Sequence, residues 1–411
     1  MAQKTCTLLL ALVTLFLAGG CTPGTASLTV YPVVNTPALE QPSATATYLP
    51  PTQTPTIIPP PTLTPAPPSQ TATSSTGMAE LVAFVEGLAA QDAFSGSILV
   101  AREAEVLWEY AHGLADREEN VPNQVDTLYN LGSMNKMFTA TAILQLVEQG
   151  KLSLDEPIAS YLPEYPNAEV ASQVTIHQLL THTSGLGDVF TEAFSADPNY
   201  YRTIDAYLPL FVDEPLLFTP GQEFSYSNAG YVVLGMLIEK VSGQSYDDYV
   251  RLNIFEPSGM TDTQAYDIEE DIPNMATGYT TVDFFGNETG ILSDNTALLP
   301  GRGFPAGGGY STVADLFGFR NALLGYRLLT QASIELLLAG KVEVRENVQY
   351  GYGFFDRVEA GGRMVGHTGG APGVCSFLSM YLDSGYTVVV LSNADLDCAA
   401  VLTFLRDNPL T

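Results

Sequence analysis

The run SMNKMFTATAILQLVEQG, residues 133–150, places a serine three residues before a lysine at the start of an apolar segment. Apolar residues recur at helical spacing after Lys136, and Gly150 is typical of the position just beyond a helix C-terminus. Ser133 is therefore predicted at a helix N-terminus, with Lys136 one turn further along the same face. A lysine whose pKa is lowered by burial or by positive neighbours can take the proton of a serine and make it a nucleophile. The alternative is a capping serine beside an unrelated surface lysine, a pair that chance supplies about once or twice in such a chain.

The composition excludes several classes of partner. The chain has 411 residues, with 45 acidic against 16 basic side chains and a formal charge of −29. This charge argues against nucleic acid or anionic lipid as a partner, and its scattered distribution indicates a solvated surface. The four histidines form no HExxH pattern and the cysteines have no zinc-ligand spacing, so neither a metal nor a cofactor is predicted.

The N-terminal region has the features of an export signal. Residues 1–21 carry Lys4, then the apolar run TLLLALVTLFLA, and end in Leu17-Ala-Gly-Gly-Cys21. This ending resembles a bacterial lipobox, although its leucine falls one position early. We expect an exported lipoprotein, at the cell surface or in the periplasm, whose membrane anchor is a lipid on Cys21. The alternative is a secretory signal that happens to contain this cysteine.

A proline- and threonine-rich segment follows at residues 22–77, where Glu40 is the one charged residue. Such a composition cannot bury a core and favours an extended tether, which could span on the order of 100–170 Å. From residue 78 to 405 the composition is that of a globular domain. We therefore expect a signal peptide at residues 1–21, a disordered tether at 22–77 and one globular domain at 78–405.

Strand-like segments lie at the two ends of this domain, and helix-like segments fill the middle. The predicted strands cover residues 95–103, 106–115, 351–360, 362–368, 376–383 and 387–393. Capping patterns at Thr175-Ile-His-Gln178 and Thr312-Val-Ala-Asp315 begin two of the helices, and Gly243 ends another. This order predicts an α/β (α+β) fold, in which an antiparallel sheet from both chain ends is flanked by helices and a helical subdomain is inserted.

A second candidate for chemistry is Tyr226-Ser227-Asn228, which follows a Pro-Gly turn and enters a helix. Tyr226 could shuttle a proton if the charge of Lys136 lowered its phenol pKa, and Asn228 could hold a substrate amide. Tyr165-Pro-Asn167 fits the same spacing in a proline-flanked turn. For Tyr226 alone, a packed aromatic is the alternative interpretation.

A third candidate is Gly366-His367-Thr368-Gly369-Gly370, at the start of a strand region. Small residues there would let a substrate lie along a strand edge. The backbone N–H groups of Gly370 and Ser133 together could form an oxyanion hole. The alternatives are a glycine-rich turn or bulge and a surface histidine.

The order Ser-x-x-Lys, Tyr-x-Asn, His-Thr-Gly resembles the serine β-lactamase and penicillin-binding-protein superfamily, in particular its class C-like branch of DD-peptidases, D-aminopeptidases and β-lactamase-type esterases. The resemblance spans about 78–405 and includes QLVEQGKLSLDEPI, TIHQLLTHTSGL, FTPGQEFSYSNAGYVVLGMLIEKVSG, PAGGGYSTVADL, YGYGF and GHTGGAPG. It implies a β-lactamase/transpeptidase-like fold with Ser133 as the acylated nucleophile. Lys136 and Tyr226 would share the base and acid roles, Asn228 would bind the substrate amide, and His367-Thr368-Gly369 would line the strand edge.

The implied function is hydrolysis of an amide or ester. Peptides that contain D-amino acids, such as those of the cell wall, come first among the expected substrates, and esters come next. A class C-like β-lactamase and a catalytically silent binding module remain as alternatives. The oligomeric state stays open.

His367 is where the chain departs from the β-lactamase pattern, because no Lys-Thr-Gly occurs in the sequence. A histidine with an ordinary pKa of about 6.5 is largely neutral at pH 7. We therefore expect peptidase or esterase chemistry rather than efficient antibiotic hydrolysis. Arg302 is the alternative cation for a substrate carboxylate, unless it belongs to a structural turn.

Two loop-rich regions, 186–222 and 265–305, are expected to decide specificity, with side chains that could line a cleft or merely pack. These side chains are Asp188, Phe190, Tyr200, Tyr201, Phe284, Phe285 and Arg302. Cys375 and Cys398 could form a disulfide in an exported protein if the last strands pack against the C-terminal helix.

Overall fold

The computed structural model describes residues 76–395 and 397–410. The predicted signal, Cys21 and nearly all of the predicted tether lie outside the described residues. Within the described part, no helix has the length and apolar character needed to cross a membrane.

The central element is an eight-stranded antiparallel sheet with strand order β2-β1-β14-β13-β12-β11-β10-β9. Its strands are β1 (Gly96–Arg102), β2 (Glu105–His112), β9 (Val342–Arg345), β10 (Val348–Tyr350), β11 (Phe355–Glu359), β12 (Gly362–Ala371), β13 (Val374–Tyr381) and β14 (Tyr386–Ser392). Because β1 pairs with β14, strands from the two ends of the domain lie side by side in this sheet. The predicted fold class is confirmed.

Three two-stranded ribbons accompany the large sheet. They pair β3 (Leu114–Asp116) with β4 (Val121–Pro122), β5 (Tyr129–Asn130) with β8 (Tyr310–Ser311), and β6 (Tyr279–Val282) with β7 (Glu288–Asp294). Strand β5 of the second ribbon lies directly before the Ser133 turn in sequence. It therefore ties the approach to that turn to the segment around residue 310.

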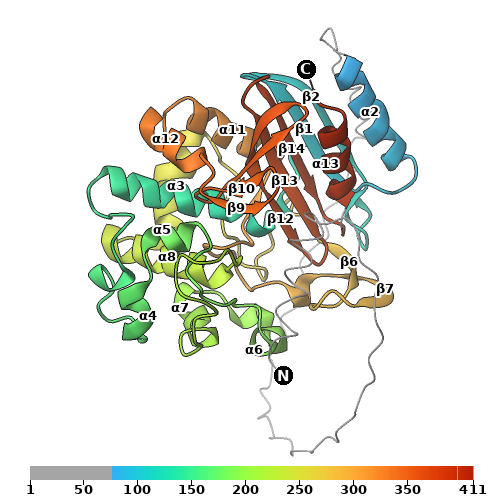
Figure 1. The fold of residues 1–411 in the computed structure, drawn as a ribbon. Coiled ribbons are helices and arrows are strands. Elements are labelled where there is room, and N and C mark those ends of the chain that lie inside the picture. Colours follow the sequence, from blue (N-terminus) through green and yellow to red (C-terminus); the bar gives the residue numbers. More distant parts are fainter. Residues whose placement is uncertain (1–75, 396, 411) are drawn as a thin grey trace, which may run out of the picture. The chain divides into compact units, whose positions relative to one another are not determined.

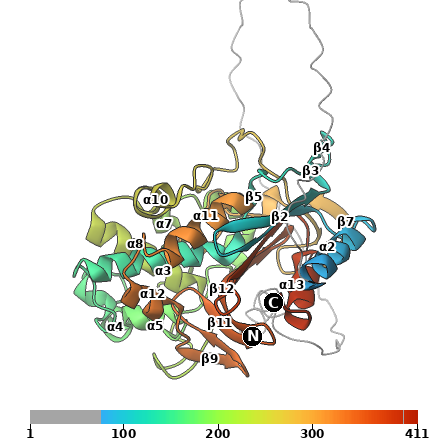
Figure 2. The ribbon, with the colours of Figure 1, turned by 90° about the horizontal axis from the view of Figure 1, so that it is seen from above.

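Helices cover both faces of the sheet (Figures 1 and 2). On one face lie α2 (Thr76–Ala89) and α13 (Asp397–Asp407), which share a core with Ile98 and Val100 of β1. Leu99 and Ala101 of the same strand belong to the larger core on the opposite face. This alternation follows from the two-residue period of a strand whose two faces are both buried.

The second face is covered by the helical region between β5 and β9. Its α-helices are α3 (Asn135–Glu148), α4 (Ala168–Gln173), α5 (Ile176–Leu180), α6 (Glu192–Ala196), α7 (Ile204–Tyr207), α8 (Asn228–Ser242), α9 (Tyr246–Val250), α10 (Glu256–Ser258), α11 (Val313–Leu324) and α12 (Gln331–Leu338). Short 3-10 turns cover Gly132–Met134, Ile158–Ser160, Pro198–Tyr200, Leu208–Leu210 and Thr296–Leu298, and a π turn at Arg251–Phe255 joins α9 to α10.

The helix boundaries follow the predicted capping residues. Thr175 and Gln178 form a reciprocal capping box at α5, and the Thr312 hydroxyl accepts from the Asp315 N–H at α11. Gly243 and Gly150 adopt the left-handed conformation after α8 and α3, with φ of 73° and 69°. These termini are confirmed.

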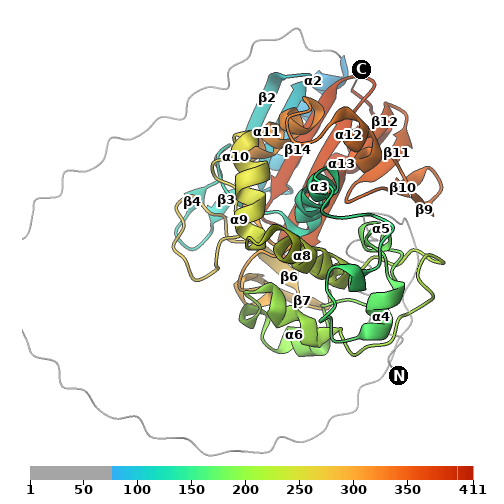
Figure 3. The ribbon, with the colours of Figure 1, turned by 90° about the vertical axis from the view of Figure 1, so that its left-hand side faces the viewer.

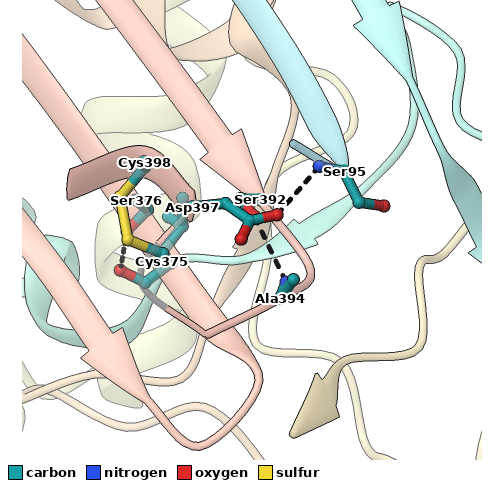
Figure 4. Close-up of a disulfide and its surroundings, with 8 residues drawn as sticks. Ser95, Cys375, Ser376, Ser392, Ala394, Asp397 and Cys398 are labelled. Atoms are coloured by element: carbon teal, nitrogen blue, oxygen red, sulfur yellow. Dashed lines mark hydrogen bonds between the residues drawn. A yellow bond between two sulfur atoms is a disulfide. The ribbon is translucent and has the colours of Figure 1, made fainter. Parts of the chain in front are cut away.

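A disulfide joins Cys375 of β13 to Cys398 of α13, with 5.6 Å between the two Cα atoms (Figure 4). Both cysteines are fully buried. The next residue, Ser376, donates its hydroxyl to the Leu131 carbonyl at 2.8 Å, and Cys375 itself pairs with Gly370 across β12–β13. The disulfide therefore fastens α13 to the strand that supports the predicted substrate edge.

Candidate active site

Ser133 lies in the 3-10 turn that leads into α3, and α3 runs beside the sheet (Figure 3). The backbone before it makes two hydrogen bonds with the Gly308–Gly309 segment. Leu131 N–H donates to the Gly309 carbonyl at 2.7 Å, and Gly308 N–H donates to the Gly132 carbonyl at 3.1 Å. Ser133 keeps partial exposure while its neighbours on both sides are buried.

Gly132 brings this turn against the end of β12. It adopts φ of +50°, and a β-carbon there would lie 2.7 Å from the Gly370 nitrogen. Likewise, a side chain on Gly369 would collide with the Leu131 carbonyl. The two segments that carry the predicted oxyanion donors, Ser133 N–H and Gly370 N–H, are thus in direct contact because neither has a side chain at the junction.

Lys136 is fully buried, and its ammonium nitrogen has three oxygen neighbours. Nζ lies 3.2 Å from Ser133 Oγ, 2.7 Å from Asn228 Oδ1 and 2.6 Å from the Ala306 carbonyl. Burial lowers the pKa of Lys136 to about 7, against the opposing charge of Asp188. An amine with this pKa is available as a base near neutral pH.

Tyr226 is buried beside Ser133, but its hydroxyl makes no hydrogen bond with good geometry among the described residues. Burial raises the pKa of Tyr226 well above its ordinary value, and contact with the Ser133 hydroxyl opposes this only in part. The condition stated for Tyr226 as a proton shuttle, a phenol pKa lowered by Lys136, is therefore not met, because burial has the larger effect. Lys136 Nζ lies over the face of the Tyr226 ring, 4.7 Å from its centroid.

Asn228 begins α8 and links Lys136 to a carboxylate. Its Oδ1 accepts from Lys136, while its Nδ2 donates to Asp188 with distances of 3.1 and 3.0 Å to the two carboxylate oxygens. The amide expected to bind substrate is thus engaged on both sides by protein groups. The sequence analysis placed Asp188 only among the loop side chains, although it stands two residues after the TIHQLLTHTSGL passage.

His367 is on β12, but its imidazole is buried rather than presented at the strand edge, with 2% exposure. Its Nδ1 lies 2.5 Å from the Thr368 carbonyl, which can only accept, so Nδ1 carries the proton. Its Nε2 then accepts from the Tyr350 hydroxyl at 3.1 Å. Burial and the charge of Lys136 lower the pKa of His367 to about 3, so the ring is neutral at pH 7.

The strand edge expected to bind substrate is formed by the backbone of β12 after Gly366. β11 pairs with β12 only as far as Gly366, whereas the pairing with β13 continues to Ala371. The segment from His367 to Gly370 therefore has its strand partner on the β13 side, and Thr368 and Gly370 are partly exposed.

Of the seven loop side chains expected at a cleft, Phe190, Tyr201, Phe284 and Phe285 pack in or against the core, whereas Tyr200 is exposed. Tyr201 and Phe284 are 7% and 8% exposed and both lie against Phe194. Arg302 pairs with Asp247 at 2.8 Å and lines a cavity of about 240 Å³ that contains none of the predicted catalytic side chains. Arg302 is therefore not the cation beside Ser133.

Comparison with known proteins decides the family, because a family model described as beta-lactamase matches residues 81–404. The chain belongs to the beta-lactamase family. This beta-lactamase family chain is 33% identical over 325 residues to penicillin-binding protein 4* of Bacillus subtilis (strain 168), covering 76% of the chain and 71% of that relative.

Solved structures of family members share the fold. A penicillin-binding protein from Bacillus halodurans matches with a TM-score of 0.72 and 34% identity, over 80% of this chain and 98% of that one. D-amino acid amidase from Ochrobactrum anthropi SV3, complexed with D-phenylalanine, matches with a TM-score of 0.68 and 26% identity, over 80% of this chain and 99% of that one. These relatives place the beta-lactamase family chain among hydrolases in general.

Proposed function

We propose that this protein is an exported serine hydrolase that forms an acyl-enzyme through Ser133 and hydrolyses an amide or an ester. One observation carries the proposal. The buried Nζ of Lys136, with its pKa lowered to about 7, lies 3.2 Å from the Ser133 hydroxyl. A nucleophile and a base within reach of each other are the minimum for this chemistry.

In the proposed mechanism, neutral Lys136 takes the Ser133 proton as Oγ attacks the substrate carbonyl carbon. The N–H groups of Ser133 and Gly370 hold the resulting oxyanion. Tyr226 begins as a neutral phenol, which agrees with its raised pKa. It gives its proton to the leaving group, and the protonated Lys136 then returns a proton to the Tyr226 oxygen. Water then attacks the acyl carbonyl carbon while Lys136 takes its proton. Lys136 passes that proton to the departing Ser133 Oγ, which releases the acid and restores the free serine.

Peptides or amides of D-amino acids are the first proposed substrates, and simple esters come next. A family member named D-amino acid amidase shares the fold. Neutral His367 also offers no permanent cation to a substrate carboxylate, which weighs against β-lactams. Asn228 and the edge at Thr368 and Gly369 are the proposed contacts for the substrate backbone.

Export with a lipid on Cys21 is a separate part of the proposal. The N-terminal sequence supports it, and so does the Cys375–Cys398 disulfide, because disulfides persist mainly in oxidising compartments. Membrane fractionation of the full chain and of Cys21→Ala tests it. Release of the variant but not of the wild type from the membrane is expected, and equal behaviour would contradict it.

Activity is tested first by labelling with a fluorescent fluorophosphonate and mapping the modified residue by mass spectrometry. Ser133→Ala should abolish labelling, whereas Ser172→Ala, at an exposed serine of α4, should not. A substrate panel follows, with D- and L-amino acid amides, D-Ala-D-Ala peptides, short esters and nitrocefin. Lack of any Ser133-dependent adduct or turnover would favour a binding module.

A further inference from the structure

We propose that Asp188 is a positioning residue that acts through Asn228, whose amide it orients toward Lys136, and that it supplies the counter-charge for that lysine. This inference rests on the proposed function, because it takes Lys136 as the base for Ser133. Nothing in the family match assigns this task to Asp188.

The hydrogen bonds of Asp188 identify it as an acceptor in every direction. Asn228 Nδ2 donates to both carboxylate oxygens, Phe190 N–H donates to Oδ1 at 3.1 Å, and Asn228 N–H approaches Oδ2 at 3.4 Å. All of these donors are N–H groups, which suits an ionised carboxylate. Burial raises the pKa of Asp188, and the Asn228 and Phe190 N–H groups together with Lys136 oppose that rise.

This acceptor decides which way the Asn228 amide points. A carboxylate cannot donate, so the NH2 end of Asn228 must face Asp188 and the carbonyl end must face Lys136. Asn228 Oδ1 then accepts from Nζ at 2.7 Å. Without Asp188 the amide could turn over and place its NH2 against the lysine, which would leave two donors facing each other.

The loop that carries Asp188 is fastened to the start of α8. The Ser227 hydroxyl donates to the Gly187 carbonyl at 2.6 Å, and Ser227 Oγ in turn accepts from Gly230 N–H at 3.1 Å. Gly185, with φ of +79°, also accepts from Leu217 N–H. The segments that carry Asp188 and Asn228 are therefore joined by the Ser227–Gly187 hydrogen bond as well as by the two side chains themselves.

Among the described groups that face Lys136, Asp188 is the one carboxylate. The others are neutral donors, acceptors or rings from each packed element, namely Ser133, Tyr226, Tyr231, Asn228, His182, His367 and the Ala306 carbonyl. Burial lowers the pKa of Lys136 and Asp188 raises it. Removing the carboxylate charge should therefore make the lysine deprotonate at lower pH.

The test is Asp188→Asn, a variant of the same shape that can still accept from Asn228 but has no charge. The rate of Ser133 labelling by a neutral fluorophosphonate is measured from about pH 5 to 9. We expect the midpoint of the rising limb to move down on the order of one pH unit relative to the wild type. Asp188→Ser removes the charge with a smaller side chain and should move the midpoint the same way.

Asp213→Asn is the matched control, because Asp213 is an exposed aspartate of the same loop-rich region and its side chain makes no hydrogen bond to the described residues. It should leave the midpoint unchanged. A folded Asp188→Asn protein whose midpoint equals that of the wild type, or lies above it, would overturn the inference. Failure of the proposed function gives a different result, since the wild type itself would then show no Ser133-dependent labelling at any pH.

Discussion

At the scale of single residues, the site depends on what burial does to two ionisable groups. Lys136 loses hydration, so its pKa falls to about 7, whereas the same burial raises the pKa of Tyr226. Desolvation disfavours the charged form of each, and the charged forms are the ammonium and the phenolate. The lysine is thereby suited to accept a proton and the tyrosine to donate one.

The pH dependence of the reaction follows from the Lys136 pKa. Because the amine is a base only when deprotonated, Ser133 labelling should be slow below about pH 6, rise through about 7 and level off above it. Lys136→Arg should reduce the rate by about a hundredfold or more, because a guanidinium does not deprotonate in this range. A wild-type rate that is flat from about pH 5 to 9 would contradict the assignment of Lys136 as the base.

Gly132 is a residue of the Ser133 turn that leaves no space for a side chain. Gly132→Ala should reduce Ser133 labelling by about a hundredfold, because the new methyl group would meet the Gly370 nitrogen at 2.7 Å. Gly150→Ala is the control, since Gly150 has a similar φ of +69° and open space around it. The control should lose about 1 kcal/mol of stability in urea unfolding and keep its labelling rate. Equal labelling by both variants would show that the β12 contact is unimportant.

At the scale of elements, the turn that carries Ser133 lies between two segments that contact it. The glycine-rich stretch at 307–309 bonds it on one side, and β12 with β13 supports it on the other. β13 is in turn joined to α13 by the Cys375–Cys398 disulfide. The site therefore depends on elements that are more than 150 residues apart in the chain.

The disulfide should contribute measurably to stability. Its cysteines are separated by 23 residues in sequence, for which loop-closure entropy gives about 3 kcal/mol. The double variant Cys375→Ala, Cys398→Ala should lose about that amount in urea unfolding, and reductant should bring the wild type to the same stability. Unchanged stability of both samples would argue that the thiols remain reduced in the native protein.

At the scale of the whole molecule, charge sets which substrates approach readily. The formal charge of −29 repels anions over distances set by the ionic strength. Neutral His367 offers no local compensation, and Arg302 is already paired with Asp247. Electrostatics thus weigh against anionic β-lactams such as nitrocefin, and favour amides and esters without a net negative charge over charged peptides.

This charge gives a salt-dependent prediction. The kcat/KM for an anionic substrate such as nitrocefin should rise severalfold between about 10 and 500 mM salt, because screening weakens the repulsion. The value for an uncharged ester should stay nearly constant and serves as the control. A fall with salt for the anionic substrate would instead point to a cationic site that attracts it.

The sequence alone determined six strands of the large sheet but not β9 and β10, together with the origin of the sheet in both chain ends. It also determined the helix termini at Thr175, Thr312, Gly150 and Gly243. These features are local, since they depend on side-chain period, on capping hydrogen bonds and on glycine at positive φ. The spacing of Ser133 and Lys136 is local in the same way, because one helical turn separates them.

Only the tertiary structure decided the environment of the site. Asp188 accepts a hydrogen bond from Asn228, and burial raises the pKa of Tyr226. His367 is buried against Tyr350, and Arg302 forms an ion pair with Asp247. Each outcome depends on which distant segment excludes water from a side chain or supplies its hydrogen bond. Burial and long-range pairing depend on how distant segments pack together, so a local sequence pattern does not predict them.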